Sequence, residues 1–316
     1  MREIRFYNSR TKKIEEFRSI LPNLVKIYSC GPTVYDYAHI GNIRSFVFAD
    51  ILKRVLILNG YPVKHVMNIT DFGHLVGDGD DGEDKMSVGL KRENLPRTLE
   101  GMKTLADKYT NLFTEDLKKM NIILPDVLPR ASENIPEYIK IIEGLEKKGF
   151  VYKTSDGLYF DTKRDPNYGF MSLLVQNEHA HARIENNEKK NPADFALWKF
   201  AESNGSTDNS SIGFPSVWGY GFPGWHIECS GMAIKYLGET FDIHTGGIDL
   251  ISVHHTNEIA QSENYTGKVF GNFFMHGEFV NINSSKMSKS KNNFFTLKSL
   301  ENENFPPLAY RYLILQ

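Results

Sequence analysis

Residues 24–70 read LVKIYSCGPTVYDYAHIGNIRSFVFADILKRVLILNGYPVKHVMNIT, and this stretch decides the fold. It opens with a strand pattern over 24–28, passes through a Gly-Pro loop into an apolar helical pattern that ends at Asn59-Gly60, and closes with a second strand pattern over 63–69. Strand, loop, helix and strand in this order form a βαβ unit, whose right-handed crossover makes the two strands parallel. The loop after the first strand then lies at the carboxyl edge of the sheet, where such sheets bind ligands.

The α/β pattern returns late in the chain, after a long intervening stretch. The late elements predicted are a helix over 225–237, a strand over 241–244, a Gly246-Gly247 turn, a helix from about 253 to 264 and a strand over 273–275. The intervening stretch shows helical periodicity over 96–149, a hairpin over 150–162, a polar run to about 192 and a Gly, Ser and Pro-rich loop over 203–223.

These patterns predict an α/β fold: a Rossmann-type doubly wound parallel sheet split by a helical and hairpin insertion. The expected divisions are 1–95 for the first half of the catalytic domain, 96–215 for the connective insertion, 216–280 for the second half, and 281–316 for a basic loop and the start of a helical domain.

The composition of the chain excludes some classes of protein. The chain has 316 residues, with 37 basic and 39 acidic side chains, so its surface as a whole does not favour nucleic acid, although a local basic site remains possible. Its apolar runs fall far short of the ~20 residues of a membrane span. The N-terminus has no secretory signal. We therefore expect a cytoplasmic protein that is monomeric and has no membrane partner.

The tetrapeptide His39-Ile40-Gly41-Asn42 lies between a predicted strand and the start of a predicted helix. Free backbone N–H groups and the positive end of the helix dipole favour a phosphate there. Gly41 would let a nucleotide approach the backbone, and His39 could donate to phosphate oxygens. The alternative from the residues alone is a turn glycine beside a surface histidine.

The segment Lys286-Met287-Ser288-Lys289-Ser290 is basic and rich in hydroxyl groups. Such a loop suits a triphosphate whose charge develops during reaction. A solvated positive loop is the alternative.

Cys30, Cys229, His254 and Glu258 form a third set. His254 and Glu258 are four residues apart and share one face of the predicted helix. The predicted sheet brings all four to its carboxyl edge. Two thiolates, an imidazole and a carboxylate suit Zn²⁺. Two buried cysteines and a surface histidine remain the alternative, because the set lacks a compact C-x-x-C spacing.

Together these motifs resemble the class I aminoacyl-tRNA synthetases, and among them the cysteine-specific family, over essentially the whole chain. The matching strings are CGPTVYD at 30–36, HIGN at 39–42, NITD at 68–71, DFALWK at 194–199, PGWHIECS at 223–230, FDIH at 241–244, HHTNEIAQS at 254–262 and KMSKS at 286–290. The resemblance implies one zinc ion held by Cys30, Cys229, His254 and Glu258, ATP with Mg²⁺, formation of cysteinyl adenylate, and transfer of the cysteinyl group to tRNA(Cys).

The resemblance also implies roles for single residues. It implies substrate contacts by Thr70, Trp225 and His244, nucleotide contacts by Gly41, Gly246, Gly247, Asp249 and Lys289, and catalysis by His39, Asn42, Lys286 and Lys289. An apolar pocket would separate cysteine from serine by only about 1–3 kcal/mol. Zinc binds thiolate far better than a neutral hydroxyl, so no editing domain is expected.

Three departures from the family pattern stand out. Asn42 replaces the usual histidine, and Thr245 replaces the usual glycine and is expected to crowd the adenosine edge. The family continues into helical and anticodon-reading domains, whereas this chain stops at 310–316 within an expected helix.

Two other functions stay open at this stage. One is a cysteine ligase of the mycothiol pathway, which uses an amino sugar as acceptor on the same scaffold. The other is a non-catalytic, zinc-stabilised paralogue. The acidic, Gly-rich segment 71–84 does not fit the spacing of an EF-hand, and we interpret it as a solvated loop.

Overall fold

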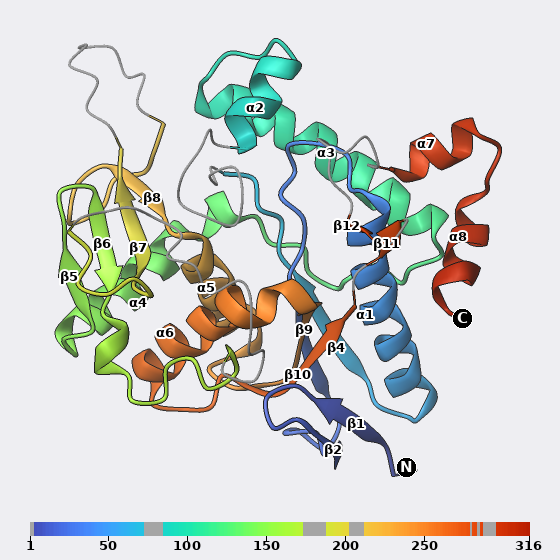
Figure 1. The fold of residues 1–316 in the computed structure, drawn as a ribbon, viewed down its shortest axis with the longest axis horizontal. Helices are drawn as coiled ribbons and strands as arrows, with labels where there is room; N and C mark the ends of the chain where they lie inside the picture. Colours follow the sequence, from blue (N-terminus) through green and yellow to red (C-terminus); the bar gives the residue numbers. More distant parts are fainter. Residues whose placement is uncertain are drawn as a thin grey trace.

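The structure, a computed structural model, describes residues 3–72, 85–172, 188–201, 212–278, 280–282, 285–286 and 295–316. Its centre is a parallel sheet of four strands in the order β10-β9-β3-β4 (Figure 1). The strands are β3 (Val25–Ser29), β4 (Val63–Met67), β9 (Phe241–Gly247) and β10 (Gly271–Gly277). The predicted α/β class and the parallel sheet are confirmed.

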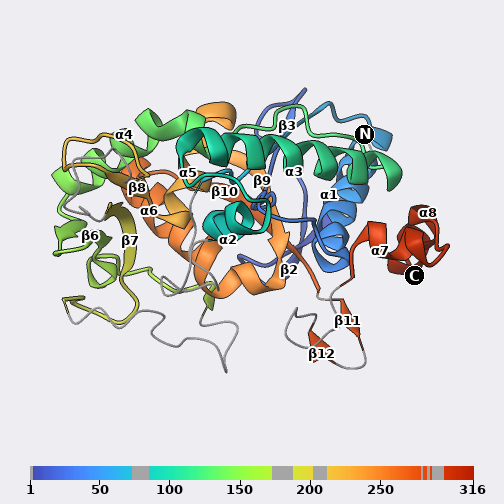
Figure 2. The same ribbon diagram turned by 90° about the horizontal axis from the view of Figure 1, so that it is seen from above.

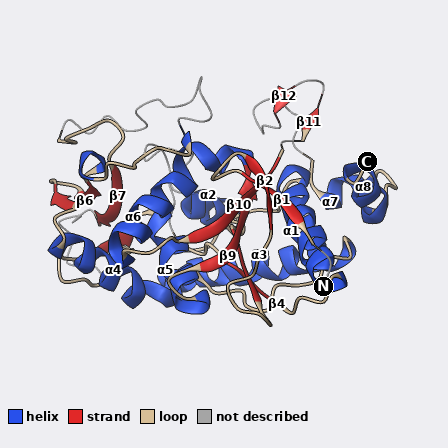
Figure 3. Ribbon diagram, turned by 90° about the horizontal axis from the view of Figure 1, so that it is seen from below, coloured by secondary structure: helices blue, strands red, loops and turns tan. Residues whose placement is uncertain are grey.

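Apolar runs with β-branched and aromatic residues form these strands because helices cover both faces of the sheet. Helix α1 (Ile40–Leu58) contacts β4, β9 and β10 on one face. Helix α5 (Trp225–Leu237) contacts β3 and β4 on the other, and α6 (Thr256–Thr266) packs beside α5 (Figures 2 and 3).

Strand β3 is the topological switch point of the sheet. From β3 the chain crosses over α1 to β4 on one side, and it later returns to β9 on the other side. The connections leaving β3 and β9 therefore diverge and open a crevice at the carboxyl edge between them. Cys30 immediately follows β3 and Gly247 ends β9, so both stand at this crevice.

The insertion combines helices with a second, antiparallel sheet of order β5-β6-β7-β8. Its helices are α2 (Lys85–Arg92), α3 (Leu99–Lys119) and α4 (Ile135–Lys147). Its strands are β5 (Val151–Lys153), β6 (Gly157–Phe160), β7 (Phe195–Phe200) and β8 (Gly221–Pro223). Short 3₁₀ turns span Ala131–Asn134 and Thr162–Arg164.

The predicted hairpin over 150–162 is confirmed as β5 and β6. The predicted loop over 203–223 is wrong at its end, since β8 lies there, beyond the expected boundary at 215. A proline is tolerated in β8 because this strand is at the edge of the sheet. Gly221 lies so close to β7 that an added Cβ would come within 2.2 Å of the Lys199 carbonyl oxygen.

Two late elements differ from the predictions. Strand β9 runs through Gly246 and Gly247, where a turn was expected, because both glycines pair with β10. A 3₁₀ turn, Ile248–Leu250, and a π-helical turn, Ile251–His255, then precede α6, so the regular helix begins later than expected.

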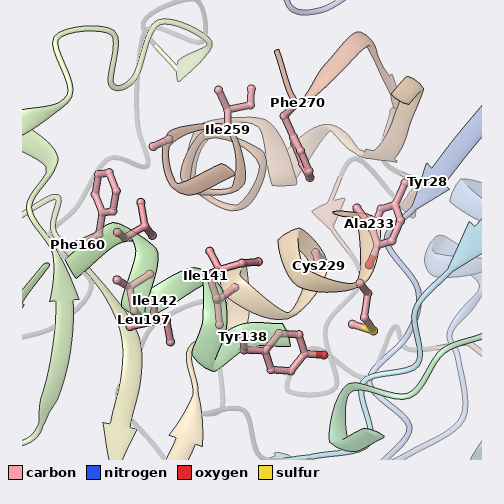
Figure 4. Close-up of a cluster of buried hydrophobic side chains, with 14 of the residues drawn as sticks. Tyr28, Tyr138, Ile141, Ile142, Phe160, Leu197, Cys229, Ala233, Ile259 and Phe270 are labelled. Carbon is pink, nitrogen blue, oxygen red and sulfur yellow. The ribbon is translucent and has the colours of Figure 1, made fainter. Parts of the chain in front are cut away.

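The largest hydrophobic core lies between α4, α5, α6 and the insertion sheet (Figure 4). Tyr138, Ile142, Leu197 and Ala233 are among its fully buried or nearly fully buried side chains. Cys229 stands in the same cluster on α5, which places its thiol at the boundary between this core and the central sheet. Helix α4 and the second sheet are thus packed continuously onto α5 and α6.

The ends of the chain add further elements: the helix expected at the C-terminus is present, whereas the N-terminal hairpin was not predicted. A hairpin of β1 (Arg5–Asn8) and β2 (Lys13–Glu16) packs against β10. Strands β11 (Asn281–Ile282) and β12 (Ser285–Lys286) form a small antiparallel pair, and α7 (Leu297–Asn302) and α8 (Pro307–Ile314) follow. Among the described residues, no helix combines the length and apolar character that crossing a membrane requires.

Candidate active site and metal centre

A cavity of about 270 Å³ opens at the crevice between the ends of β3 and β9. The predicted site residues that line it are Cys30, His39, Asn42, Thr70, Trp225, Cys229, Gly247, Asp249 and His254. They come from six separate segments of the chain, from the early half, the late half and the loops between their elements. Tertiary folding therefore brings the histidine motif and three of the four metal-ligand candidates into one cavity, while Glu258 contacts this set but is not a lining residue.

The loop that carries Cys30 is fixed by close backbone contacts. The Cys30 N–H donates to the Thr245 carbonyl at 3.2 Å, and the Gly31 N–H donates to Asn68 Oδ1 at 2.9 Å. A Cβ on Gly31 would lie only 1.8 Å from the Asn68 carbonyl oxygen. Glycine is therefore required where the chain leaves β3 beside the end of β4, and this approach sets the position of Cys30.

The four metal-ligand candidates converge. One potential ligand atom from each of Cys30, Cys229, His254 and Glu258 lies within 4.8 Å of all the others. The helical spacing acts as predicted, since His254 Nε2 and Glu258 Oε1 are 2.8 Å apart. Two sulfur atoms, one imidazole nitrogen and one carboxylate oxygen grouped so closely fit a four-coordinate zinc site.

Charge is concentrated at this cluster although it is buried. Burial alone would raise the pKa of Glu258, but His244 and His254 hold it at about 2. Burial would likewise lower the pKa of His254, whereas Glu258 and Cys229 raise it to about 10. A hydrogen bond from Cys30 lowers the pKa of Cys229 to about 6, while burial and the neighbouring Cys229 raise the pKa of Cys30. The cluster favours one thiolate and one carboxylate beside a protonated His254, whose proton a bound metal ion would displace.

A layer of further histidines supports the cluster. His244 Nε2 is 2.7 Å from Glu258 Oε2, and His226 Nδ1 is 2.9 Å from His254 Nδ1. His255 Nε2 is 3.4 Å from the Cys30 sulfur, and its Nδ1 is 2.8 Å from His276 Nε2. A second possible ligand group, Cys30, His244, His255 and Glu258, shares two members with the first. Contacts of this kind fix the tautomer and orientation of ligands.

His244 and Gly246 do not line the cavity. His244 is fully buried, and its contact with Glu258 places it behind the ligand set rather than on the cavity wall, where a direct substrate contact was expected. Gly246 packs against His255 and Leu250, which an added Cβ would approach to 2.8 Å. Both residues therefore lie behind the side chains that line the cavity.

Thr70 and Trp225 form part of the wall beside the metal-ligand candidates. Thr70 is buried, and its hydroxyl accepts a hydrogen bond from Asn68 Nδ2 at 3.1 Å. The Trp225 ring lies 4.3 Å from the His254 ring, measured between centroids. A small side chain bound at the cluster would therefore lie against the indole ring.

The N-terminus of α1 faces another part of the cavity. His39 is the N-cap of this helix, and its Nδ1 accepts from the Asn42 N–H at 3.2 Å. Gly41 belongs to the first turn but is not a lining residue. Gly247 lies close to Asp249, since an added Cβ would be 2.4 Å from Asp249 Oδ1. This end presents the positive end of the helix dipole to an anion, although the Ile40 and Asn42 N–H groups already have partners within the chain.

The basic loop is described only at its margins. The backbone of Lys286 belongs to β12, whereas Lys289 lies outside the described residues, as does most of the segment 71–84. Beyond the basic loop, the Phe295 carbonyl accepts from the Ile40 N–H at 2.9 Å. The chain therefore leaves this loop directly beside the N-terminus of α1.

Thr245 does not crowd this edge of the cavity. Its side chain is buried, and its Oγ1 is 2.6 Å from Ser29 Oγ, which also shares a hydrogen bond of 2.8 Å with His65 Nε2. The hydroxyl lies on one face of the sheet beside Ser29, its partner on the neighbouring strand β3.

Several residues of the site escaped the sequence analysis. Asn68, Asp36 and His226 stand within the matching strings but had no assigned role, and His255 adjoins a predicted ligand. Lys85 follows the acidic segment and lines the cavity, although nothing in its local pattern indicates this. Its position depends on contacts between parts of the chain that are far apart in the sequence.

Comparison with known proteins identifies a family that this chain matches. Residues 16–316 match the family model described as the catalytic domain of class I (C) tRNA synthetases. The chain is 47% identical to Cysteine--tRNA ligase 1 of Burkholderia lata over 311 residues, which is 98% of this chain and 64% of the relative. It is also 47% identical to the Cysteine--tRNA ligase of Treponema denticola, covering 99% of this chain and 62% of the relative.

The solved structure of Mycobacterium tuberculosis methionyl-tRNA synthetase in complex with methionyl-adenylate has a similar fold. Its TM-score to this chain is 0.68 at 13% sequence identity, covering 93% of this chain and 64% of the other. At this identity the likeness concerns the fold alone. The chain spans less than two thirds of the length of each of these relatives.

Proposed function

This chain belongs to the family of class I (C) tRNA synthetase catalytic domains, and from this premise we propose that it activates L-cysteine with ATP and transfers the cysteinyl group to tRNA(Cys). The names of the relatives support cysteine as the amino acid. We further propose that the protein works in the cytoplasm as a monomer.

One observation carries the proposal: a buried Cys, Cys, His and Glu set and the N-terminus of a long helix share one cavity. The first feature suits a thiol-containing substrate, and the second suits a nucleotide phosphate. A reaction that joins an amino acid to the α-phosphate of ATP needs both substrates side by side.

Cys30, Cys229, His254 and Glu258 would hold one Zn²⁺. When bound, the ion supplies a soft Lewis acid that favours a thiolate over the hydroxyl of serine. The protein's own part is to keep these donors close, to carry the charge of Glu258 between two histidines, and to place Trp225 and Thr70 beside the bound side chain.

His39 and the first turn of α1 would bind the phosphates, with Asn42 as a neutral hydrogen-bond donor. Gly41, Gly246, Gly247 and Asp249 would shape the nucleotide side, and Lys286 and Lys289 would act on phosphate charge from the basic loop. Mg²⁺ would accompany ATP. The substrate carboxylate attacks the α-phosphorus in line, the bond to the pyrophosphate oxygen breaks, and catalysis arises from positioning and fixed charges.

Cysteine-dependent exchange of pyrophosphate into ATP tests the activation step. Exchange with cysteine and none with serine, on protein containing one zinc per chain, is the expected result. A folded, zinc-loaded protein without exchange would contradict the proposal. Charging of tRNA(Cys), assayed against ligation of cysteine to an amino sugar, then identifies the acceptor.

A further inference from the structure

Lys85 is a cation of the cavity whose role the motifs do not explain. Lys85 is the only lysine or arginine among the described residues that line it. Its Nζ lies 6.0 Å from the centroid of the Trp225 ring, and that ring is 4.3 Å from the His254 ring. The ammonium group and the metal-ligand candidate His254 therefore both lie near the same indole ring, in the cavity that Trp225 lines.

Helix α2 holds Lys85 in this position. At the other end of the helix, Arg92 Nη1 forms an ion pair of 3.0 Å with Asp36 Oδ2, and its Nη2 donates to the Tyr35 carbonyl. Gly89 lies so close to the cavity loop that an added Cβ would come within 2.9 Å of the same carbonyl oxygen. The helix is thus fastened to the Tyr35-Asp36 segment, which itself lines the cavity.

We propose that Lys85 binds the carboxylate of the amino-acid substrate, an assignment that rests on the proposed function. With its thiol at the cluster, a cysteine molecule extends its carboxylate roughly 4–5 Å from the sulfur, which brings it alongside Trp225. The only lysine or arginine described in the cavity lies there, and a carboxylate is the charged group of the substrate that an ammonium group attracts.

This contact has a direct use in the reaction. The carboxylate must approach the α-phosphate, and two anions repel each other strongly in a partly desolvated cavity. An ammonium group beside the carboxylate reduces that repulsion without exchanging a proton. The carboxylate oxygen forms its bond to phosphorus, and the electron pair of the broken bond leaves with pyrophosphate, so Lys85 stays protonated throughout.

Binding of two thiols distinguishes this role from a structural one. L-cysteine and cysteamine share the thiol and the amine, but cysteamine lacks the carboxylate. Calorimetric titration of the zinc-loaded protein with each thiol, on the wild type and on Lys85→Met, compares them. Loss of a charge-assisted contact should weaken cysteine binding about 10- to 100-fold, with cysteamine binding unchanged within twofold.

Lys91→Met is the matched control, because Lys91 is on the same helix, is exposed, and does not line the cavity. It should bind both thiols as the wild type does. Lys85→Arg should recover part of the cysteine affinity, since it restores the charge. Zinc content measured on every variant shows whether the ligand set is intact.

Different results would contradict the role of Lys85 and the proposed function. Equal loss of both thiols in Lys85→Met, or unchanged cysteine binding, would overturn the assignment of Lys85 while wild-type exchange leaves the proposed function standing. A wild type that binds neither thiol and shows no exchange would overturn the proposed function itself.

Discussion

Glu258 is fully buried and yet carries a charge, because His244 and His254 contact its two carboxylate oxygens. Such a buried group is costly unless it is paired. The pairing makes the ligand set rigid before any cation binds. At the scale of single residues, the site is therefore a preorganised pocket of donors rather than a set of flexible side chains.

Replacing Cys229 with serine should remove the metal while the fold survives. A hydroxyl has the size of the thiol to within a fraction of an ångström but is a poor ligand for zinc at neutral pH. We expect zinc content to fall from one per chain to well below that, with far-UV circular dichroism unchanged. Metal analysis after dialysis checks this result.

Met232→Leu on the same helix is a suitable control, since Met232 is also buried but offers no ligand in the set. It should retain zinc, because volume-conserving swaps disturb a core little. A Cys229→Ser protein with a full complement of zinc would refute the ligand assignment.

At the scale of elements, the approach between the ends of β3 and β4 shapes the cavity. Gly31→Ala would force its Cβ against the Asn68 carbonyl, whose oxygen would be 1.8 Å away. The Asn68 carbonyl is part of the backbone, and the added Cβ is bonded directly to the backbone of residue 31. Neither group can move without separating the ends of β3 and β4. We expect an unfolding free energy lower by more than about 3 kcal/mol and a reduced zinc content, as measured by urea unfolding and metal analysis.

Gly277→Ala provides the comparison at the end of another strand. Its Cβ would meet Phe48 at 3.7 Å, an ordinary van der Waals distance, and Gly277 has no positive φ. A loss within about 1 kcal/mol is expected there. Similar losses in the two variants would show that the close approach at Gly31 is not the cause.

Helix α3 contains a carboxylate whose burial costs stability. Burial raises the pKa of Asp116 to about 6, so the folded state binds its proton more tightly than the unfolded chain does. Above pH 6 the folded protein must hold the charge in a buried position, and stability falls as pH rises from about 4 to about 6.

Asp116→Asn should therefore be more stable than the wild type at pH 8. Solvent near the carboxyl group limits the gain to about 1 kcal/mol. The gain should shrink at pH 5 and vanish near pH 4, where both states of the wild type become protonated. Urea unfolding at these three pH values measures it, and a gain that grows toward low pH would contradict the argument.

At the scale of the whole molecule, the segment beyond the basic loop is fastened back onto the catalytic domain. Arg311 of α8 is buried, with Nη2 2.6 Å from Asp50 Oδ2 on α1 and Nη1 donating to the Met120 carbonyl at 2.9 Å. The Tyr310 hydroxyl donates to the Ile40 carbonyl at 2.8 Å. The first turn of α1, which faces the cavity, is therefore tied to the C-terminal helices.

Arg311→Met should destabilise the protein, because it leaves the buried Asp50 with less compensation and the Met120 carbonyl without its donor. A loss of about 2–3 kcal/mol is expected, with zinc content unchanged since the ligand set does not include this region. Arg18→Met is the control: Arg18 pairs with Glu16 at an exposed position, where solvent screens the pair, so its loss should leave the unfolding free energy almost unchanged. Equal effects of the two variants would refute the structural role of Arg311.

Much of the fold could be predicted because its signals are local. The βαβ unit of residues 24–70 follows from periodicity and from the Asn59-Gly60 stop, and the spacing of His254 and Glu258 places them on one face of a helical segment even though a π-helical turn precedes α6. The hairpin β1–β2 and strand β8 were missed, because short edge strands depend on the neighbours they pair with and carry weak patterns of their own.

From residue type and spacing alone, the sequence predicted the class of fold and the helix N-terminus at His39, and it named the four metal-ligand candidates, which the family resemblance then supported. The tertiary structure was needed to show that Cys30 and Cys229 meet, that His244 lies behind Glu258 rather than on the cavity wall, that Thr245 contacts Ser29 of the neighbouring strand, and that Lys85 lines the cavity. These outcomes depend on packing between segments far apart in the chain, where a neighbour's carbonyl or ring decides which way a side chain can point.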